Sequence, residues 1–311
     1  MNRRNMMNAM VACPGAAALV GGLSACATPS GQGAGTAGDG VPFFLYDSFT
    51  TSPFSGNPAP VVVLDAWLPV PLMQAFATEM NQSEVAFVLK GPAGWQIRWF
   101  TPAKEVPLNG HATLSAAALI FEKYEPSARE LVFQTTSSGP LGVSRNGTSY
   151  LMDFPRDDDP VRVADIPAEI EADLGVRPAE FWVNKRNVLV FRNAEEVRAI
   201  RSRLTKSTAW AKGKHVMVTA PGTGDVDYVL RYFAPLLDIP EDPVTGVVHC
   251  TLAPFWARRL GKNSFKVRQL SARGGDVATG VQANGRVLIG GPCVRYAEGR
   301  LHIAQAMGRD R

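Results

Sequence analysis

The 311-residue sequence is poor in cysteine and histidine, with four of each. All four histidines are isolated in the chain: His111, His215, His249 and His302. No His-x-x-x-His or Cys-x-x-Cys pair occurs, so the ligand spacing of a common zinc site is absent. Removing Cys13 with a leader leaves an odd number of cysteines, which does not make a disulfide framework. We expect Cys250 and Cys293 to be small buried hydrophobic residues.

Long runs of one charge are also absent. Charged residues make up 19% of the chain and hydrophobic residues 46%, which is typical of a soluble globular enzyme. The net charge of +4 comes from scattered lysines and arginines, with no basic run interleaved with aromatic residues. Nucleic acid is therefore not an expected partner.

The first forty residues differ in composition from the rest. Arg3 and Arg4 precede a weakly apolar stretch over residues 6–20, which is followed by Leu23-Ser24-Ala25-Cys26. A basic start, a short apolar segment and a small-residue site are typical of an export signal rather than a membrane span. The last four residues resemble a bacterial lipobox, in which Cys26 would become the lipidated first residue.

These features predict a signal over residues 1–26 and a flexible tether over residues 27–40. The protein is then expected in the cell envelope, attached to the membrane only through a lipid anchor at Cys26. Two alternatives stay open. The paired arginines could mark twin-arginine export, and a start codon placed too far upstream would make the protein cytoplasmic.

From residue 41 onward, strand-like and helix-like segments alternate. Strands are predicted at residues 43–49, 59–64, 85–89, 96–101, 130–135, 141–145, 150–154, 188–191, 215–219, 228–233, 265–270 and 286–289. Helices are predicted at residues 68–80, 111–124, 194–203 and about 246–260. A polar break at Asp157-Asp158-Asp159-Pro160 predicts a crossing between two half-domains, 41–157 and 158–311, with the last strand free to return to the first.

An internal repeat supports this division. Arg98-Trp99-Phe100-Thr101-Pro102 recurs as Arg231-Tyr232-Phe233-Ala234-Pro235, and Val106-Pro107 recurs as Ile239-Pro240 at the same offset. Each half then turns into an apolar helix at a glycine, Gly110 or Gly246, with a three-residue insertion in the second half. The sequence therefore predicts a duplicated half-domain, with too few copies for a solenoid.

Both predicted helix starts are suited to binding an anion. The first turn of a helix has free N–H groups and a partial positive charge, and glycine lets a ligand approach the backbone closely. Gly110 and Gly246 therefore predict a paired clamp for one carboxylate or phosphate. The alternative is two ordinary buried helices.

Three ionisable residues lie near these turns. Glu84 opens an apolar strand, an odd place for a carboxylate unless it faces a cavity. His111 is either functional or a capping or core histidine. Asp242, within Glu241-Asp242-Pro243, either carries chemistry or starts a turn.

Several motifs together resemble the phenazine-biosynthesis PhzF family. They occur in order along the chain: Asp47-Ser48-Phe49 with Phe54-Ser55-Gly56-Asn57-Pro58-Ala59, Met80-Asn81-Gln82-Ser83-Glu84, Arg98-Trp99-Phe100-Thr101-Pro102, Gly110-His111-Ala112-Thr113, Glu241-Asp242-Pro243-Val244-Thr245-Gly246 and Gln269-Leu270-Ser271-Ala272-Arg273-Gly274-Gly275. The resemblance implies a diaminopimelate-epimerase-like α/β fold, in which two pseudo-symmetric halves each wrap a curved sheet around a central helix. It also implies an active site between the halves and a homodimer.

The same resemblance implies a cofactor-independent isomerase or epimerase. Such an enzyme moves a proton at a carbon next to an activating group of a small carboxylate. Glu84 matches the family's general acid/base, while His111 and Asp242 match the residues that help hold the substrate and its proton. The residues then expected to bind substrate are Asn57, Asn109, Gly110, Thr245, Gly246, Val247, Gly274 and Gly275.

Two departures from the family pattern bear on this expectation. Val247 stands where the family usually has serine, so a hydroxyl that could orient substrate is missing. Asn109 stands where many relatives have cysteine, and Cys250 lies a full turn into its helix, which argues against a two-thiol racemase. The alternative function is an envelope-anchored small-molecule-binding protein of the same fold that has lost catalysis.

Overall fold

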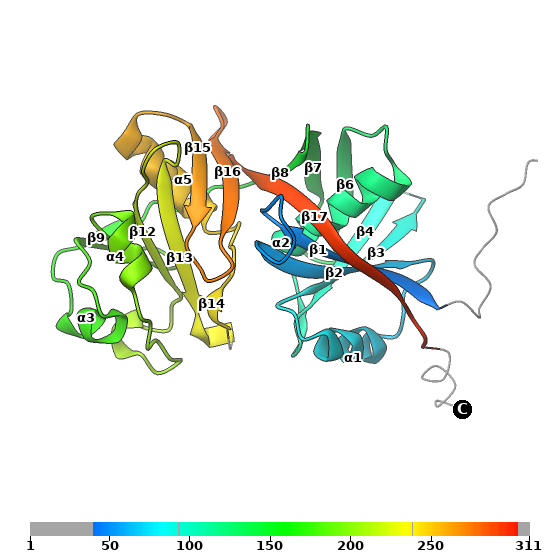
Figure 1. The fold of residues 1–311 in the computed structure, drawn as a ribbon, viewed down its shortest axis with the longest axis horizontal. Coiled ribbons are helices and arrows are strands. Elements are labelled where there is room, and N and C mark those ends of the chain that lie inside the picture. The colour runs from blue at the N-terminus through cyan, green and yellow to red at the C-terminus, as the bar shows by residue number, and fades with distance from the viewer. Residues whose placement is uncertain (1–39, 93, 238, 304–311) are drawn as a thin grey trace, which may run out of the picture. The chain divides into compact units, whose positions relative to one another are not determined.

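The computed structural model of the protein describes residues 40–92, 94–237 and 239–303, which belong to one compact unit (Figure 1). The predicted export signal, Cys26 and the tether up to residue 39 lie outside the described residues and stay predictions. Within the described ranges, no helix combines the length and apolar character needed to span a bilayer.

Eight strands pair edge to edge into a closed ring. Their bounds are β1 (Val41–Ser48), β2 (Asn57–Leu64), β3 (Val85–Gly91), β4 (Gly94–Phe100), β6 (Glu130–Gln134), β7 (Leu141–Asn146), β8 (Ser149–Phe154) and β17 (Val287–Leu301). Each strand pairs with the next in this order, and β17 closes the ring by pairing with both β8 and β1. The first six residues of β17 lie beside β8 and the following residues lie beside β1.

A second run of strands begins after residue 160. It comprises β9 (Val161–Val163), β10 (Glu180–Val183), β11 (Asn187–Val190), β12 (Val216–Pro221), β13 (Tyr228–Ala234), β15 (Ser264–Gln269) and β16 (Gly275–Val281), and it ends on β17. Two short strands lie at the side, β5 (Glu105–Val106) on β4 and β14 (Ile239–Asp242) on β13. The expectation of an α/β protein is confirmed, with many strands and few helices.

The two runs of strands repeat one pairing order. From β1 to β8 the successive pairs are antiparallel, parallel, antiparallel, parallel, antiparallel and antiparallel. From β10 to β17 the order is the same. The repeated arginines also have matching partners, since Arg98 binds Glu105 and Arg231 binds Glu241, each through two hydrogen bonds.

Helix α2 (His111–Leu119) lies within the strand ring and is buried along its whole length. It contacts β1, β2, β3, β8 and β17. Its alanines favour helix and their small side chains let the surrounding strands approach closely. The helix continues as a π-helical turn, η1 (Ile120–Tyr124).

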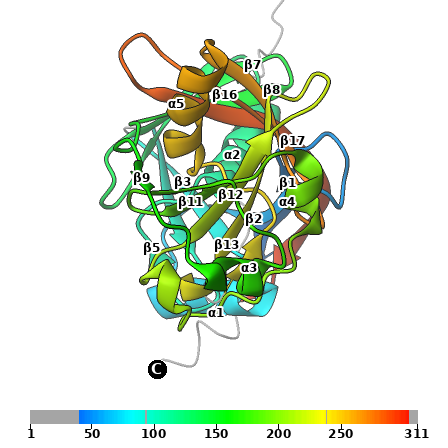
Figure 2. The same cartoon turned by 90° about the vertical axis from the view of Figure 1, so that its left-hand side faces the viewer.

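The second run of strands has a corresponding helix, α5 (His249–Leu260), which is buried from His249 to Trp256 and contacts β16 and β17. Outer helices cover the other sheet faces. Helix α1 (Val70–Met80) packs on β3 and β4. Helix α4 (Ala194–Ala199) packs on β12 and β13, on the side that faces the viewer in Figure 2. Helix α3 (Ala168–Leu174) shares the α4 core, and two single turns, η2 (Ala209–Ala211) and η3 (Pro235–Leu237), complete the described helices.

Candidate active site

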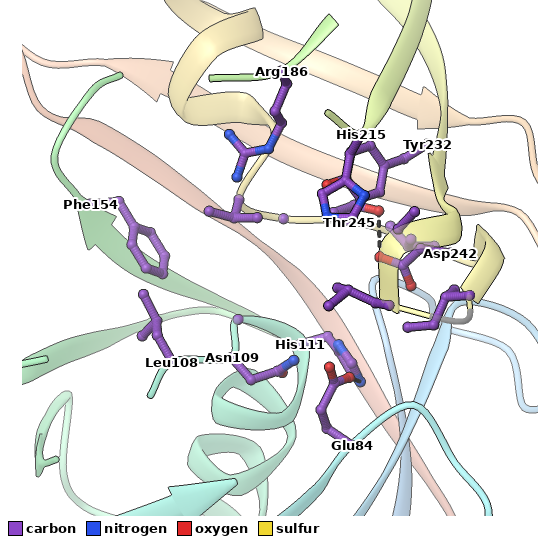
Figure 3. A pocket seen from close by; sticks show the side chains of 17 residues that line it. Glu84, Leu108, Asn109, His111, Phe154, Arg186, His215, Tyr232, Asp242 and Thr245 are labelled. Atoms are coloured by element: carbon purple, nitrogen blue, oxygen red, sulfur yellow. Dashed lines mark hydrogen bonds and ion pairs between the residues drawn. The ribbon is translucent and has the colours of Figure 1, made fainter. Parts of the chain in front are cut away.

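A cavity of about 250 Å³ opens beside the start of α2 and the turn that leads into α5 (Figure 3). It is lined by Glu84, Leu108, Asn109, Gly110, His111, Phe154, Arg186, His215, Tyr232, Ala234, Leu237, Ile239, Asp242, Val244, Thr245, Gly246 and Val247. The lining therefore draws on both runs of strands. It brings together most of the site residues that the sequence predicts.

Glu84 immediately precedes β3 and follows the turn after α1. The turn reverses the chain at Asn81, whose φ of 48° is left-handed, a conformation that asparagine tolerates better than most residues. The Glu84 side chain is only 12% exposed. Burial and the nearby negative charge of Asp242 raise its pKa to about 7, while hydrogen bonds from Ser83 and Asn109 oppose the shift.

His111 is the first residue of α2 and its Nε2 lies 3.6 Å from Oε2 of Glu84. The two groups do not form an ion pair at neutral pH, because burial lowers the pKa of His111 to about 3. The backbone carbonyl of Pro58 accepts a hydrogen bond from this ring. Since Nε2 faces Ser83 Oγ at 3.4 Å as well as Glu84, we assign the ring proton to Nδ1 and the lone pair to Nε2.

Asp242 ends β14 and is the second acid of the cavity. Its Oδ1 accepts a hydrogen bond from Asn57 and its Oδ2 accepts one from the hydroxyl of Thr245. Burial raises its pKa to about 6, although both hydrogen bonds favour the ionised form. Two carboxyl groups that gain or lose protons near neutral pH therefore face one cavity.

Buried amides hold the turn that carries Asp242 and Thr245. Gln269 accepts from the backbone N–H of Thr245 at 2.9 Å and donates to the backbone carbonyl of Asp242 at 2.7 Å. Asn57 also donates to the carbonyl of Val244 at 2.7 Å. Both amide side chains are fully buried, so they fix the cavity wall from behind.

Residues at both helix starts line the cavity. Asn109 accepts a hydrogen bond from the N–H of Ala112 at 2.8 Å and so caps α2. Among the described residues, the backbone N–H groups of Gly110, Gly246 and Val247 have no acceptor. Such groups at helix N-termini favour an anion.

Three predicted binding residues lie outside the lining. Asn57 holds Asp242 instead, as described above. The carbonyl of Gly274 accepts from the N–H of Gly56 at 2.8 Å. Gly275 packs behind the wall, where an added Cβ would come within 2.5 Å of Val244 Cγ2. These three residues lie behind or beside the lining, and their expected contacts with substrate stay predictions.

Three polar lining residues were not predicted as site residues: Arg186, His215 and Tyr232. Tyr232 belongs to the repeated Arg-aromatic-Phe-x-Pro motif, which predicted the duplicated half-domain but gave no indication of a role in the site. Arg186 and His215 carry no local signal, because the strand pairing alone brings them to the cavity. No described cysteine lines it, and burial raises the pKa of both Cys250 and Cys293 to about 12. Among the described residues, no three potential metal ligands cluster together.

Known proteins are similar to this chain in sequence and fold. An uncharacterized isomerase of Pseudomonas aeruginosa is 44% identical over 263 residues, which cover 84% of this chain and 98% of that protein. The crystal structure of a PhzF-family phenazine biosynthesis protein of Enterococcus faecalis superposes with a TM-score of 0.80 at 39% identity, covering 85% of this chain and 99% of that one.

A more distant likeness concerns the fold alone. A hydroxyproline epimerase of Agrobacterium vitis superposes with a TM-score of 0.53 at 11% identity, covering 84% of this chain and 90% of that chain.

The profile of the phenazine biosynthesis-like proteins, PhzC-PhzF, matches residues 46–299. The chain therefore belongs to the PhzF phenazine biosynthesis-like family, whose fold is diaminopimelate-epimerase-like and whose members include proteins named isomerase or epimerase.

Proposed function

We propose that this protein is a cofactor-independent isomerase or epimerase, with Glu84 as its general acid/base. The observation that carries the proposal is the placement of Glu84, whose largely buried carboxyl group lines the cavity 3.6 Å from Nε2 of His111. Burial there raises its pKa to about 7. A general acid/base works best when its pKa lies near the working pH, because both protonation states are then accessible. The names of the bacterial relatives support the reaction class.

The proposed chemistry is one proton transfer in each direction. The Glu84 carboxylate takes a proton from a carbon next to an activating group, and the electron pair moves into that group. The carboxylic acid then returns the proton. Return to another carbon on the same face gives an isomer, whereas inversion at one carbon needs a donor on the other face. Asp242, with a pKa of about 6, is the second acid that lines the cavity.

The substrate proposed is a small carboxylate. Its carboxylate oxygens would accept hydrogen bonds from the free N–H groups of Gly110, Gly246 and Val247. Neutral His111 would hold the substrate or its proton through Nε2. Val247 lines the cavity with an apolar side chain, so substrate orientation would rest on the backbone.

We also propose that two pseudo-symmetric half-domains arose by duplication, with the boundary near residue 157. The repeated pairing order of the strands supports it, as do the matched pairs Arg98–Glu105 and Arg231–Glu241.

Exchange with solvent tests the proposed reaction. The wild-type protein is incubated in heavy water with small amino and hydroxy carboxylates, and deuterium at carbon is followed by NMR. An isomerase or epimerase incorporates deuterium into at least one compound. A binding protein that has lost catalysis would shift the NMR signals of a bound ligand without any exchange, and that outcome would refute the proposal.

A further inference from the structure

The cavity has a second polar wall that the proposed chemistry does not use. In Figure 3, Arg186, His215 and Tyr232 lie on the side away from Glu84 and His111. Arg186 comes from the turn between β10 and β11, and Tyr232 comes from β13. The rings of His215 and Tyr232 lie edge to face, with centroids 5.8 Å apart.

Arg186 is held in place before any ligand arrives. Its Nη1 donates to Oδ2 of Asp157 at 3.0 Å, and its backbone N–H donates to Oδ1 of Asn184 at 2.9 Å. Asp157 is in turn held by the hydroxyl of Thr251, on α5, at 2.7 Å. The Arg186 side chain is only 12% exposed, so little side-chain entropy remains to be lost when it binds an anion.

Arg186 is not fully neutralised by its partner. The Asp157 carboxylate also binds Lys185, which lies outside the cavity lining, so two cations share one anion. Burial and the positive charge of Arg186 lower the pKa of His215, so its ring is neutral at neutral pH. Asp242, the acid nearest Tyr232 along the wall, already accepts hydrogen bonds from Asn57 and Thr245.

The polar groups of this wall also keep unused hydrogen-bonding capacity. A guanidinium has five N–H donors, and a single carboxylate and the hydroxyl of Tyr232 do not occupy them all. Nδ1 of His215 is buried and has no partner among the described residues. Arg186 is fixed in place, faces the cavity and keeps free N–H groups. Such a guanidinium can donate two parallel hydrogen bonds to a carboxylate or a phosphate.

We propose that Arg186, with His215 and Tyr232, binds a second anionic group of the substrate, which is therefore a dianion. The inference rests on the proposed function, in which the first carboxylate lies at the starts of α2 and α5. The substrate class becomes a small dicarboxylate, with its reacting carbon beside Glu84 and its far carboxylate at Arg186. Phe154 and Leu108 line the apolar side of the space between them.

Binding of simple dicarboxylates tests this subsite without any turnover. Malonate, succinate, glutarate and adipate are each compared with their monomethyl esters, which remove one charge and keep the chain length, by titration calorimetry on the full chain. We expect at least one diacid to bind about tenfold or more tightly than its ester. Arg186→Gln should remove that preference and leave the affinity for the ester unchanged.

Lys185→Gln is the matched control. It removes a cation from the same Asp157 carboxylate, but the Lys185 side chain is 57% exposed and does not line the cavity, so the preference should persist. Arg186→Lys keeps a cation for Asp157 and should retain part of the preference if the Gln variant fails to fold. The proposal is overturned if no diacid binds, if diacids and esters bind alike, or if both Gln variants lose the preference equally.

The two proposals fail separately. If diacids show no preference while wild-type protein still exchanges deuterium into monocarboxylates, the Arg186 subsite is wrong and the isomerase stands. If the preference depends on Arg186 but no compound exchanges, the isomerase is wrong and the subsite stands.

Discussion

Asn57 donates a hydrogen bond of 2.9 Å to Oδ1 of Asp242, a residue 185 positions later in the chain. The same amide nitrogen donates to the carbonyl of Val244, so one buried side chain at the start of β2 holds both ends of a short turn. The acid of one strand run is thus fixed by an amide of the other. The wall of the cavity depends on this contact.

Asn57→Ala should therefore reduce both stability and activity. It leaves the Val244 carbonyl and one Asp242 oxygen without this donor in a buried place, which costs about 1–3 kcal/mol. Urea denaturation measures the loss of stability. The rate of deuterium incorporation should also fall, because Asp242 is no longer held in place. Asn146→Ala, at an exposed position in β7, is the matched control. Unchanged stability in Asn57→Ala would show that the turn does not need the amide.

The raised pKa of Glu84 predicts a dependence of stability on pH. The folded protein holds this proton up to a pH of about 7, whereas the unfolded chain releases it near 4.5, so stability falls as pH rises between these values. Glu84→Gln removes the effect, and the variant should gain roughly 2–3 kcal/mol relative to wild type at pH 8 compared with pH 4. Denaturant titrations at both pH values measure it.

The matched control for that experiment is Glu79→Gln, at an exposed position on α1. It should change stability by the same small amount at both pH values. A Glu84→Gln variant that behaved like this control would mean that Glu84 ionises normally in the folded protein.

Val247→Ser tests the residue that departs from the family pattern. Val247 lines the cavity and is only partly buried, so a hydroxyl there should leave the fold intact and change which carboxylates bind. A thermal-shift panel compares the variant with wild type and with Val161→Ser, whose side chain is 72% exposed on β9. An identical ligand profile in all three proteins would show that Val247 does not contact ligands.

The lipobox predicts that Cys26→Ser abolishes lipid attachment. Metabolic labelling with a palmitate analogue and fractionation of cells that express the full chain measure it. Wild-type protein should be labelled and sediment with membranes, and the variant should be neither. Unlabelled wild-type protein that stays in the soluble fraction and retains Met1 would refute the predicted lipid anchor.

Most of the fold was predictable because its signals are local. The strands β1 to β4 and the helix α2 lie within a few residues of the predicted ranges, since β-branched runs and glycine turns mark them. Strand β16 was missed because Gly275 and Gly280 look like turns in the sequence. The last strand was predicted over four residues but extends over fifteen.

Long-range contacts explain that difference. Gly290 of β17 lies so close to Tyr150 of β8 that a Cβ on Gly290 would come within 1.8 Å of the Tyr150 carbonyl oxygen. Only glycine fits at this position of the strand. A sequence pattern shows the glycine but not the neighbouring strand that requires it. The helix predicted from residue 246 begins at His249. Residues 246–248 follow directly on the turn at residues 242–245 that Asn57 and Gln269 hold, a contact that the sequence does not show.

The site residues also divide into those that local sequence motifs predict and those that only tertiary contacts bring to the cavity. Glu84, His111 and Asp242 stand out in short motifs, and the structure brings all three to one cavity. Arg186 and His215 reach that cavity only because β11 pairs with β12 and because Asp157 anchors the turn at Arg186. The polar break at Asp157 marked a crossing in the sequence, but its role in holding an arginine depends on tertiary structure.

The most direct test of the central claim is deuterium incorporation by Glu84→Gln. The amide keeps the size and hydrogen-bonding reach of the side chain but cannot carry a proton between carbon and solvent. With a compound that wild-type protein exchanges, the variant should lose about 10²–10⁴-fold in exchange rate. Its affinity for that compound, measured by calorimetry, should change little, because the proposed carboxylate clamp is at Gly110 and Gly246. Exchange by Glu84→Gln at a rate near that of wild type would contradict the account and move the acid/base role to another group.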